Sequence, residues 1–238
     1  MQANTHMGLN KTGAKMSPVD VSNMEEFADL NPVTDSLESI ETMRAEAIAE
    51  ADSVGSVPVP GTFRGMVETG MSMMKGDKPA VLIDKLGERL AFERTGTRLY
   101  EALITKCLQL MPAQDQRLLA LTRIHSQEVE HFQMLKASLE SLGADPTAQT
   151  PCADVTAVMS SGIMQVVTDP RTNLAQSLNA MLVAELADNA SWELLLKLVT
   201  QAGHDTLAEG FRKALEQEQE HLLIVKQMLE DAVMVDAT

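Results

Sequence analysis

The chain has 238 residues, enough for one good-sized domain with an appendage. Its 34 acidic residues outnumber its 19 lysines and arginines, and the formal charge of −15 disfavours binding to phosphate backbones or anionic membranes. Aromatic residues make up 3% of the chain while 16 residues are methionine, so any core must be aliphatic. This composition favours helices over sheets, and we expect an all-α protein that binds neither nucleic acid nor membrane.

The two cysteines, Cys107 and Cys152, exclude a disulfide framework and lie too far apart for a Cys-x-x-Cys redox or zinc site. The N-terminal residues contain no apolar run of the length that a secretory signal needs. No stretch approaches the roughly 18 apolar residues of a membrane span. We therefore expect a soluble, cytoplasmic protein.

Residues 1–79 are expected to form an N-terminal arm, partly disordered, with one or two short helices. Residues 1–35 mix polar residues, glycine, proline and methionine without a period. Residues 36–52 are rich in helix formers, and the Val-Pro-Val-Pro-Gly stretch at 57–61 must end any helix there. The apolar spacing over 61–76 predicts a further amphipathic helix.

From residue 80 to 238 the apolar spacing is that of long helices, and these residues are predicted to form the main domain. Short joins make two antiparallel hairpins. The middle connection, 144–169, can travel the roughly 45 Å of a 30-residue helix and is predicted to include a short helix over 156–167. This predicts a four-helix bundle with one long crossover between the second and third helices. The expected helices span about 80–110, 113–142, 169–203 and 205–232, with Asp169-Pro170 opening the third and Asp205 capping the fourth.

Each expected helix carries an apolar stripe that a carboxylate interrupts near mid-helix. Glu93 and His131 lie equally far from Pro112, and Glu185 and His221 lie equally far from Gly203, so each antiparallel hairpin should place its two residues at the same height. Each half of the domain supplies one lone glutamate and one Glu-x-x-His pair. In chain order these residues are Glu93, Glu128 with His131, Glu185, and Glu218 with His221.

Four carboxylates in one apolar layer would repel one another and lose hydration, so the pattern needs a compensating charge. Two divalent metal ions supply it, because four carboxylates contribute −4 and two such ions +4. Residues three apart share a helix face, which lets the glutamate and histidine of a Glu-x-x-His pair bind the same ion. Mixed oxygen and nitrogen ligands with open positions suit iron or manganese. One such pair alone is usually a solvated helix face; two level pairs, each with a lone glutamate, favour a metal site.

The succession of Glu93, Glu128-Val129-Glu130-His131, Glu185 and Glu218-Gln219-Glu220-His221 resembles the ferritin-like superfamily of di-iron carboxylate proteins, over about residues 80–232. The pattern is most similar to the rubrerythrin and bacterioferritin type. Tyr100 stands where those proteins place a tyrosine near the cluster. Asp188 stands where rubrerythrins carry an extra glutamate, so the resemblance makes it a seventh candidate ligand, although its side chain is one methylene shorter.

The resemblance implies an oxidative-stress enzyme in which two iron ions reduce H₂O₂ or O₂, as a rubrerythrin-like peroxidase or a ferroxidase acting on Fe²⁺. Two cysteines cannot build a rubredoxin domain, so an external electron donor is expected. A homodimer or larger homo-oligomer is also expected. Two alternatives stay open: a dimanganese catalase, and a non-catalytic stress or assembly protein held together by metal. His125 is interpreted as a surface residue or a neighbour of the ligands, and Cys107 and Trp192 are interpreted as packing residues.

Overall fold

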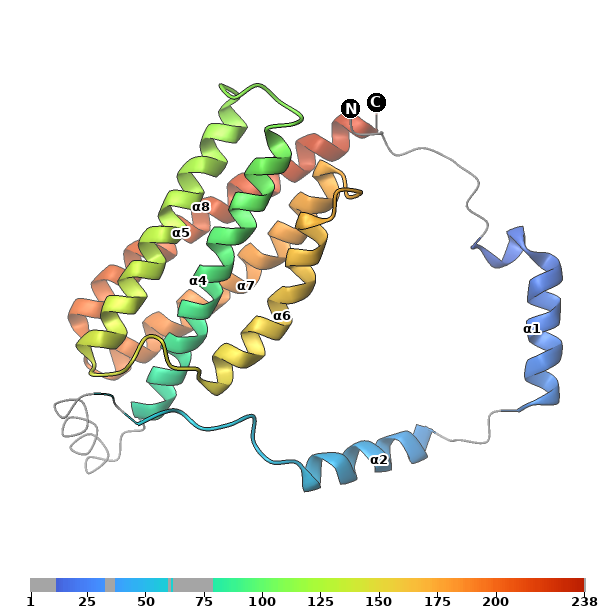
Figure 1. Cartoon of the computed structure of the whole chain (residues 1–238), viewed down its shortest axis with the longest axis horizontal. Coiled ribbons are helices and arrows are strands. Elements are labelled where there is room, and N and C mark those ends of the chain that lie inside the picture. The colour runs from blue at the N-terminus through green and yellow to red at the C-terminus, as the bar shows by residue number, and fades with distance from the viewer. Residues whose placement is uncertain (1–11, 33–36, 60, 62–78, 238) are drawn as a thin grey trace. The chain divides into compact units, whose positions relative to one another are not determined.

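The computed structural model describes residues 12–32, 37–59, 61 and 79–237 (Figure 1). Every regular element within these ranges is a helix, which confirms the all-α prediction. No described helix has both the length and the apolar character needed to cross a membrane. The predicted helix over 61–76 lies outside the described residues, apart from residue 61. The chain divides into two compact units, one ending at Ser53 and one starting at Val54.

The first unit contains a 3-10 turn, Ala14–Met16 (η1), followed by helices α1, Pro18–Leu30, and α2, Leu37–Glu50. Helix α2 coincides with the helix expected over 36–52. Helix α1 falls in a segment that the aperiodic sequence left without a predicted helix. Pro18 suits its first turn, and none of its residues is buried, so no apolar period was needed to form it.

The second unit contains four long helices, which lie side by side in Figure 1: α4, Pro79–Cys107; α5, Gln116–Ser141; α7, Leu174–Gln201; and α8, Asp205–Asp236. They agree with the four predicted helices to within a few residues at most ends. Helices α5 and α7 are followed by Gly143 and Gly203, whose φ angles of 77° and 76° fall in the left-handed region that glycine tolerates. The α8 start differs in detail, because Asp205 is its first helical residue and not its cap.

The start of the third long helix was predicted wrongly. Asp169 does not open α7 but ends the preceding helix α6, Pro151–Thr168, which is longer than the short helix expected over 156–167. Helix α7 begins at Leu174, after a capping box in which Asn173 and Gln176 each accept a hydrogen bond from the other's backbone N–H. Asp169 instead accepts hydrogen bonds from Arg171 in the turn between the two helices.

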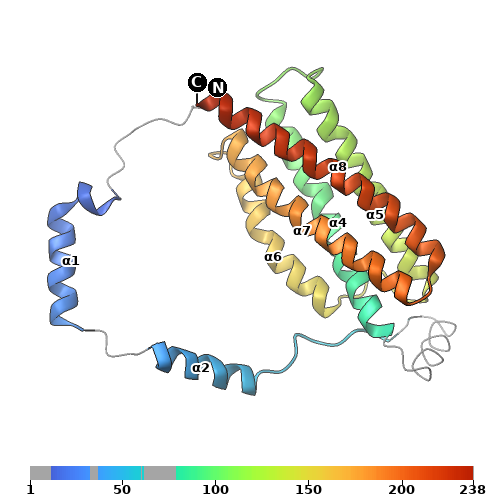
Figure 2. The same cartoon turned by 180° about the vertical axis from the view of Figure 1, so that it is seen from behind.

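Helix α6 packs against α4 and α7, so the crossover adds a fifth helix to the four long ones (Figure 2). The core of this unit consists of two apolar clusters, one at each end of the long helices. The first includes Leu103, Leu121, Met181 and Val225, and the second includes Leu86, Leu135, Leu195 and Phe211. On α5, α7 and α8 the predicted site residues stand between the residues of these two clusters in sequence, so a polar layer separates two apolar ones.

Candidate metal centre

The structure brings the six predicted ligands together in this polar layer. Each is at most 3% exposed. Their potential ligand atoms form two groups that share Glu218, and within each group all such atoms lie within 4.8 Å of one another, so the groups could hold metal ions. One group contains Glu93, Glu128, His131 and Glu218, and the other contains Glu185, Glu218 and His221.

Both histidines turn their Nδ1 atoms toward the shared carboxylates. His131 Nδ1 lies 2.7 Å from Glu218 Oε1. His221 Nδ1 lies 3.1 Å from Glu218 Oε2 and 3.3 Å from Glu128 Oε1. The two imidazole rings are stacked, with centroids 6.0 Å apart. The carboxylate of Glu218 therefore lies between two imidazole nitrogens that come from different helices, α5 and α8.

The opposite nitrogen of each ring is held by a glutamine on the other helix. His131 Nε2 lies 3.0 Å from Gln217 Oε1, and His221 Nε2 lies 2.9 Å from Gln127 Oε1. An amide oxygen only accepts, so each Nε2 carries the hydrogen and each neutral Nδ1 presents a lone pair to the carboxylates. A lone pair facing a carboxylate oxygen at 2.7 Å is repulsive unless a proton or a metal cation lies between them. Sequence reasoning missed both glutamines, although each directly precedes the glutamate of its own Glu-x-x-His pair.

Two of the four carboxylates accept a hydrogen bond on one oxygen, and each of the four has another oxygen without a donor. Glu93 Oε1 accepts a hydrogen bond of 2.9 Å from Trp192 Nε1, and Glu185 Oε1 accepts one of 2.5 Å from the Tyr100 hydroxyl. Buried polar atoms normally have a partner, so an unpartnered oxygen on each glutamate is a strong indication of a cation. Among the described residues no hydrogen-bond donor reaches these oxygens: Glu93 Oε2, Glu128 Oε1, Glu185 Oε2 and Glu218 Oε1.

Asp188, the proposed seventh ligand, lies outside both groups of ligand atoms. Its Oδ1 atom lies 2.6 Å from Nη1 of Arg89, and both residues are 2% exposed. Arg89 Nε also lies 3.1 Å from Glu93 Oε1. Arg89 and Asp188 therefore neutralise each other, and the four glutamates contribute a charge of −4 when all of them are ionised. Sequence reasoning missed Arg89; its place four residues before Glu93 was the available signal.

Burial raises the pKa of Glu93 and of Glu185 to about 8, and the negative charge of Asp188 adds to the effect. Burial also raises the pKa of Glu128 and of Glu218, again with help from neighbouring carboxylates. Burial has the opposite effect on the pKa of the histidines, because it disfavours their charged form, and it lowers the pKa of His221 to about 3. A cluster without metal is thus mostly uncharged at neutral pH, and divalent ions would have to displace protons from it.

Two aromatic residues next to the cluster hold glutamate ligands in place. Tyr100 is 1% exposed, and burial raises its pKa, so it stays a neutral donor to Glu185. Trp192 packs in the second apolar cluster, as the sequence analysis interpreted it, and its indole N–H also donates to Glu93. A buried indole needs an acceptor for this hydrogen. His125 lies outside the cluster, 3.4 Å from Glu101, and Cys107 is buried in the apolar core.

The residues fit a pair of divalent cations. Charge is one reason, because the four glutamates at −4 balance two such ions. Space is another: a Cβ atom on Gly96 would overlap Oε2 of Glu128, so this carboxylate lies directly against the backbone of α4. Glycine at this position leaves room for a ligand at the centre of the helices.

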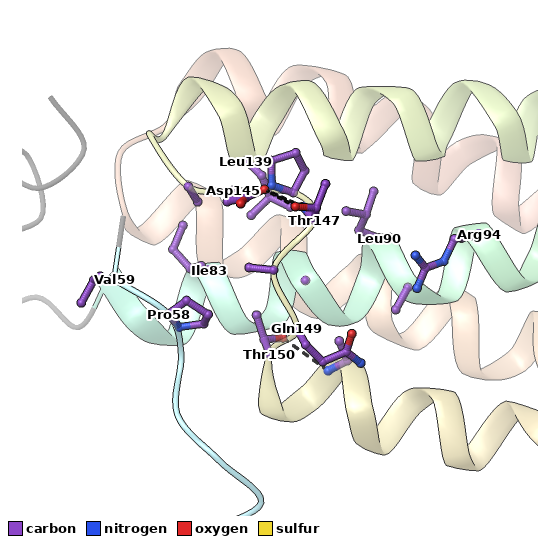
Figure 3. Close-up of a pocket in the computed structure, with 16 residues that line it drawn as sticks. Pro58, Val59, Ile83, Leu90, Arg94, Leu139, Asp145, Thr147, Gln149 and Thr150 are labelled. Atoms are coloured by element: carbon purple, nitrogen blue, oxygen red, sulfur yellow. Dashed lines mark hydrogen bonds between the residues drawn. The ribbon is translucent and has the colours of Figure 1, made fainter. Parts of the chain in front are cut away.

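A separate hollow lies at the end of the second unit where α4 begins, and Figure 3 shows its lining. Ile83, Leu90 and Arg94 of α4 form one side, and the connection between α5 and α6 contributes Asp145 and Thr150 among others. None of the six candidate ligands lines this hollow, so it is distinct from the candidate metal centre.

Comparisons with models of known protein families, with curated proteins and with solved structures find no match to this chain.

Proposed function

We propose that the cluster holds two iron ions and that the protein is a ferritin-like di-iron oxidoreductase that reduces H₂O₂ or O₂. The observation that carries this proposal is the set of four buried glutamates whose inward oxygens have no donor, facing two histidine Nδ1 atoms. Two divalent cations satisfy these atoms and neutralise the layer at once.

The arrangement of the helices supports the same family. The ligands come from four long helices in the order Glu, Glu-x-x-His, Glu, Glu-x-x-His, and α6 lies in the long connection between the second and third of them. Di-iron carboxylate proteins of the ferritin-like type build their sites in this way, with side chains that project inward from facing helices. We propose that the second unit is such a bundle with an additional helix in its crossover.

Bound iron would supply redox electrons and an open coordination position for the oxidant. The protein's own residues position the ligands. Gln127 and Gln217 fix which histidine nitrogen faces the ions. Trp192 and Tyr100 fix two of the glutamates by hydrogen bonds, and the buried layer keeps bulk water from competing for these interactions. Electrons come from an external donor, since the chain lacks the four cysteines of a rubredoxin site.

Metal analysis of anaerobically purified protein tests the proposal, followed by assay of peroxide or O₂ consumption with a reductant. We expect two iron ions per chain, and the loss of one ion in Glu128→Gln and in His221→Gln. Glu130→Gln is the matched control, because Glu130 lies in the same Glu-x-x-His segment but is exposed. Two ions retained in both ligand variants, or no metal in the wild type, would refute the assignment. Manganese with oxygen evolution from peroxide would indicate a dimanganese catalase.

A second candidate is a non-catalytic protein whose metals hold the helices together. The burial of all six ligands favours it, because a closed site suits a structural metal. Bound metal that raises the melting temperature, with no turnover of peroxide, O₂ or Fe²⁺, would identify this role.

A further inference from the structure

The surface of α6 and of the first two thirds of α7 carries almost no charge. Between Val155 and Trp192 the charged side chains are Asp169, Arg171, Glu185 and Asp188. The first two form an ion pair of 2.6 Å with each other, and the last two are buried in the polar layer. In a chain with a formal charge of −15, these adjacent helices present a neutral surface.

This neutral surface is also apolar. On α6, Val158 is 75% exposed and Met159 is 64% exposed. Val155 on α6 and Leu186 on α7 are exposed as well. Single exposed apolar residues are ordinary, but a group of them on neighbouring helices without charged residues among them is typical of a protein interface.

Gly162 adds an independent indication. It is exposed in the interior of α6, and a Cβ atom built on it would have nothing within 4 Å. Glycine is a poor helix former, and nothing in the described structure requires it here. Close approach of a second helix does require a small residue, and the neighbouring exposed residues Ala157 and Ser161 are small too.

We infer that two copies of this chain associate through this α6–α7 surface, around a twofold axis near Gly162. The occupant is a second copy for reasons of charge. A basic partner or an anionic surface would gain little from α6, whose one charged side chain is Asp154 in its first turn. Two copies at −15 repel each other over most of their surface, and they can meet where neither carries a charge. A twofold interface places the same patch on both sides, so a neutral apolar patch complements itself.

Sedimentation velocity of the full chain over a range of concentrations tests the inference. The wild type should sediment as a dimer, with twice the 25.9 kDa mass of one chain. Met159→Glu places two carboxylates in one interface and should raise the dimer dissociation constant about 100-fold or more, because facing like charges cost several kcal/mol. Leu223→Glu is the matched control, since Leu223 is 66% exposed on α8, and it should leave the dimer unchanged.

Gly162→Ala separates association from folding. It should raise or preserve the melting temperature, because alanine favours a helix and its Cβ atom meets open space. It should nevertheless weaken the dimer, because the added methyl group separates the two helices. A wild type that is monomeric at all concentrations, or a dimer that Met159→Glu leaves intact, would overturn the inference. Binding of the monomer to neutral lipid vesicles would assign the surface to a membrane instead.

Discussion

Replacing Asp188 by asparagine, alone and together with Arg89→Met, distinguishes two roles for this carboxylate: a metal ligand, or the counterion of Arg89. The buried layer contains five carboxyl groups and one guanidinium, and it carries −4 when all five carboxyl groups are ionised, as metal binding requires. Asp188→Asn changes this charge to −3 and leaves Arg89 as an unbalanced cation 3.1 Å from Glu93. The double variant restores −4 with side chains of similar size.

If Asp188 is a counterion, Asp188→Asn weakens metal affinity by about 10- to 100-fold, the usual effect of disturbing the groups around metal ligands. The double variant then regains most of that affinity and still binds two ions. Folding stability should follow the same pattern. Asp188→Asn leaves the buried Arg89 without this partner, at a cost of about 3–5 kcal/mol, and the double variant recovers most of this loss.

The fluorescence of Trp192 can be used to measure metal binding. This residue is the single tryptophan of the chain and donates a hydrogen bond to Glu93, so its fluorescence should respond to a transition metal bound there. Metal titrations followed at this residue give affinities, and urea unfolding of the metal-free proteins gives stabilities. An affinity of the double variant as low as that of Asp188→Asn would show that Asp188 is a ligand and refute the counterion role.

Three further predictions concern the same layer. Gln217→Leu should weaken metal affinity about 10- to 100-fold, as measured by Trp192 fluorescence, while Gln219→Leu at an exposed position should not. Gly96→Ala should lower metal content in elemental analysis, because its methyl group displaces the Glu128 carboxylate. Glu93 and Glu185, with pKa values of about 8, should release protons when metal binds at pH 7; calorimetry in buffers of different ionisation enthalpy would detect this, and an absence of release would contradict these values.

The pH dependence of the metal-free protein has a definite sign. A carboxyl group whose pKa rises from 4.5 to about 8 on folding binds more protons in the native state, so stability falls as the pH rises through this range. Histidines with a lowered pKa act oppositely, but only below their ordinary value of about 6.5. Between pH 6.5 and 8 the carboxyl effect acts alone, and the melting temperature should fall. Bound metal should abolish this fall, and a rise over the same interval would contradict the assignment.

The positions of the six candidate ligands along the helices could be predicted because an antiparallel hairpin fixes height. Residues equally far from Pro112, or equally far from Gly203, must lie at the same height along the two antiparallel helices. The distance from the turn does not fix how each helix is rotated about its axis. Contacts such as that of Trp192 with Glu93, 99 residues earlier in the chain, depend on this rotation and on packing across the whole unit.

Helix boundaries near Asp169 show a different limit of prediction. Asp-Pro is a good local signal for a helix start, and Asn173 with Gln176 is a capping box. Local energetics alone do not choose between them. Helix α6 packs on α4 and α7 and extends to Thr168, so Asp169 becomes the C-terminal cap of α6. The capping box at Asn173 therefore starts α7. Tertiary packing therefore decides between two plausible caps.

The paired glutamines give the metal layer a property that its ligands alone would lack. Gln127 and Glu128 lie on α5, yet the first holds a histidine of α8 and the second faces that same histidine. Gln217 and Glu218 hold His131 of α5 in the reciprocal way. Neither histidine has its orientation fixed by its own helix alone, so the site forms only when α5 and α8 are docked in register. Metal binding at this site would thereby be coupled to the packing of the two hairpins against each other, and any variant that loosens one should weaken the other.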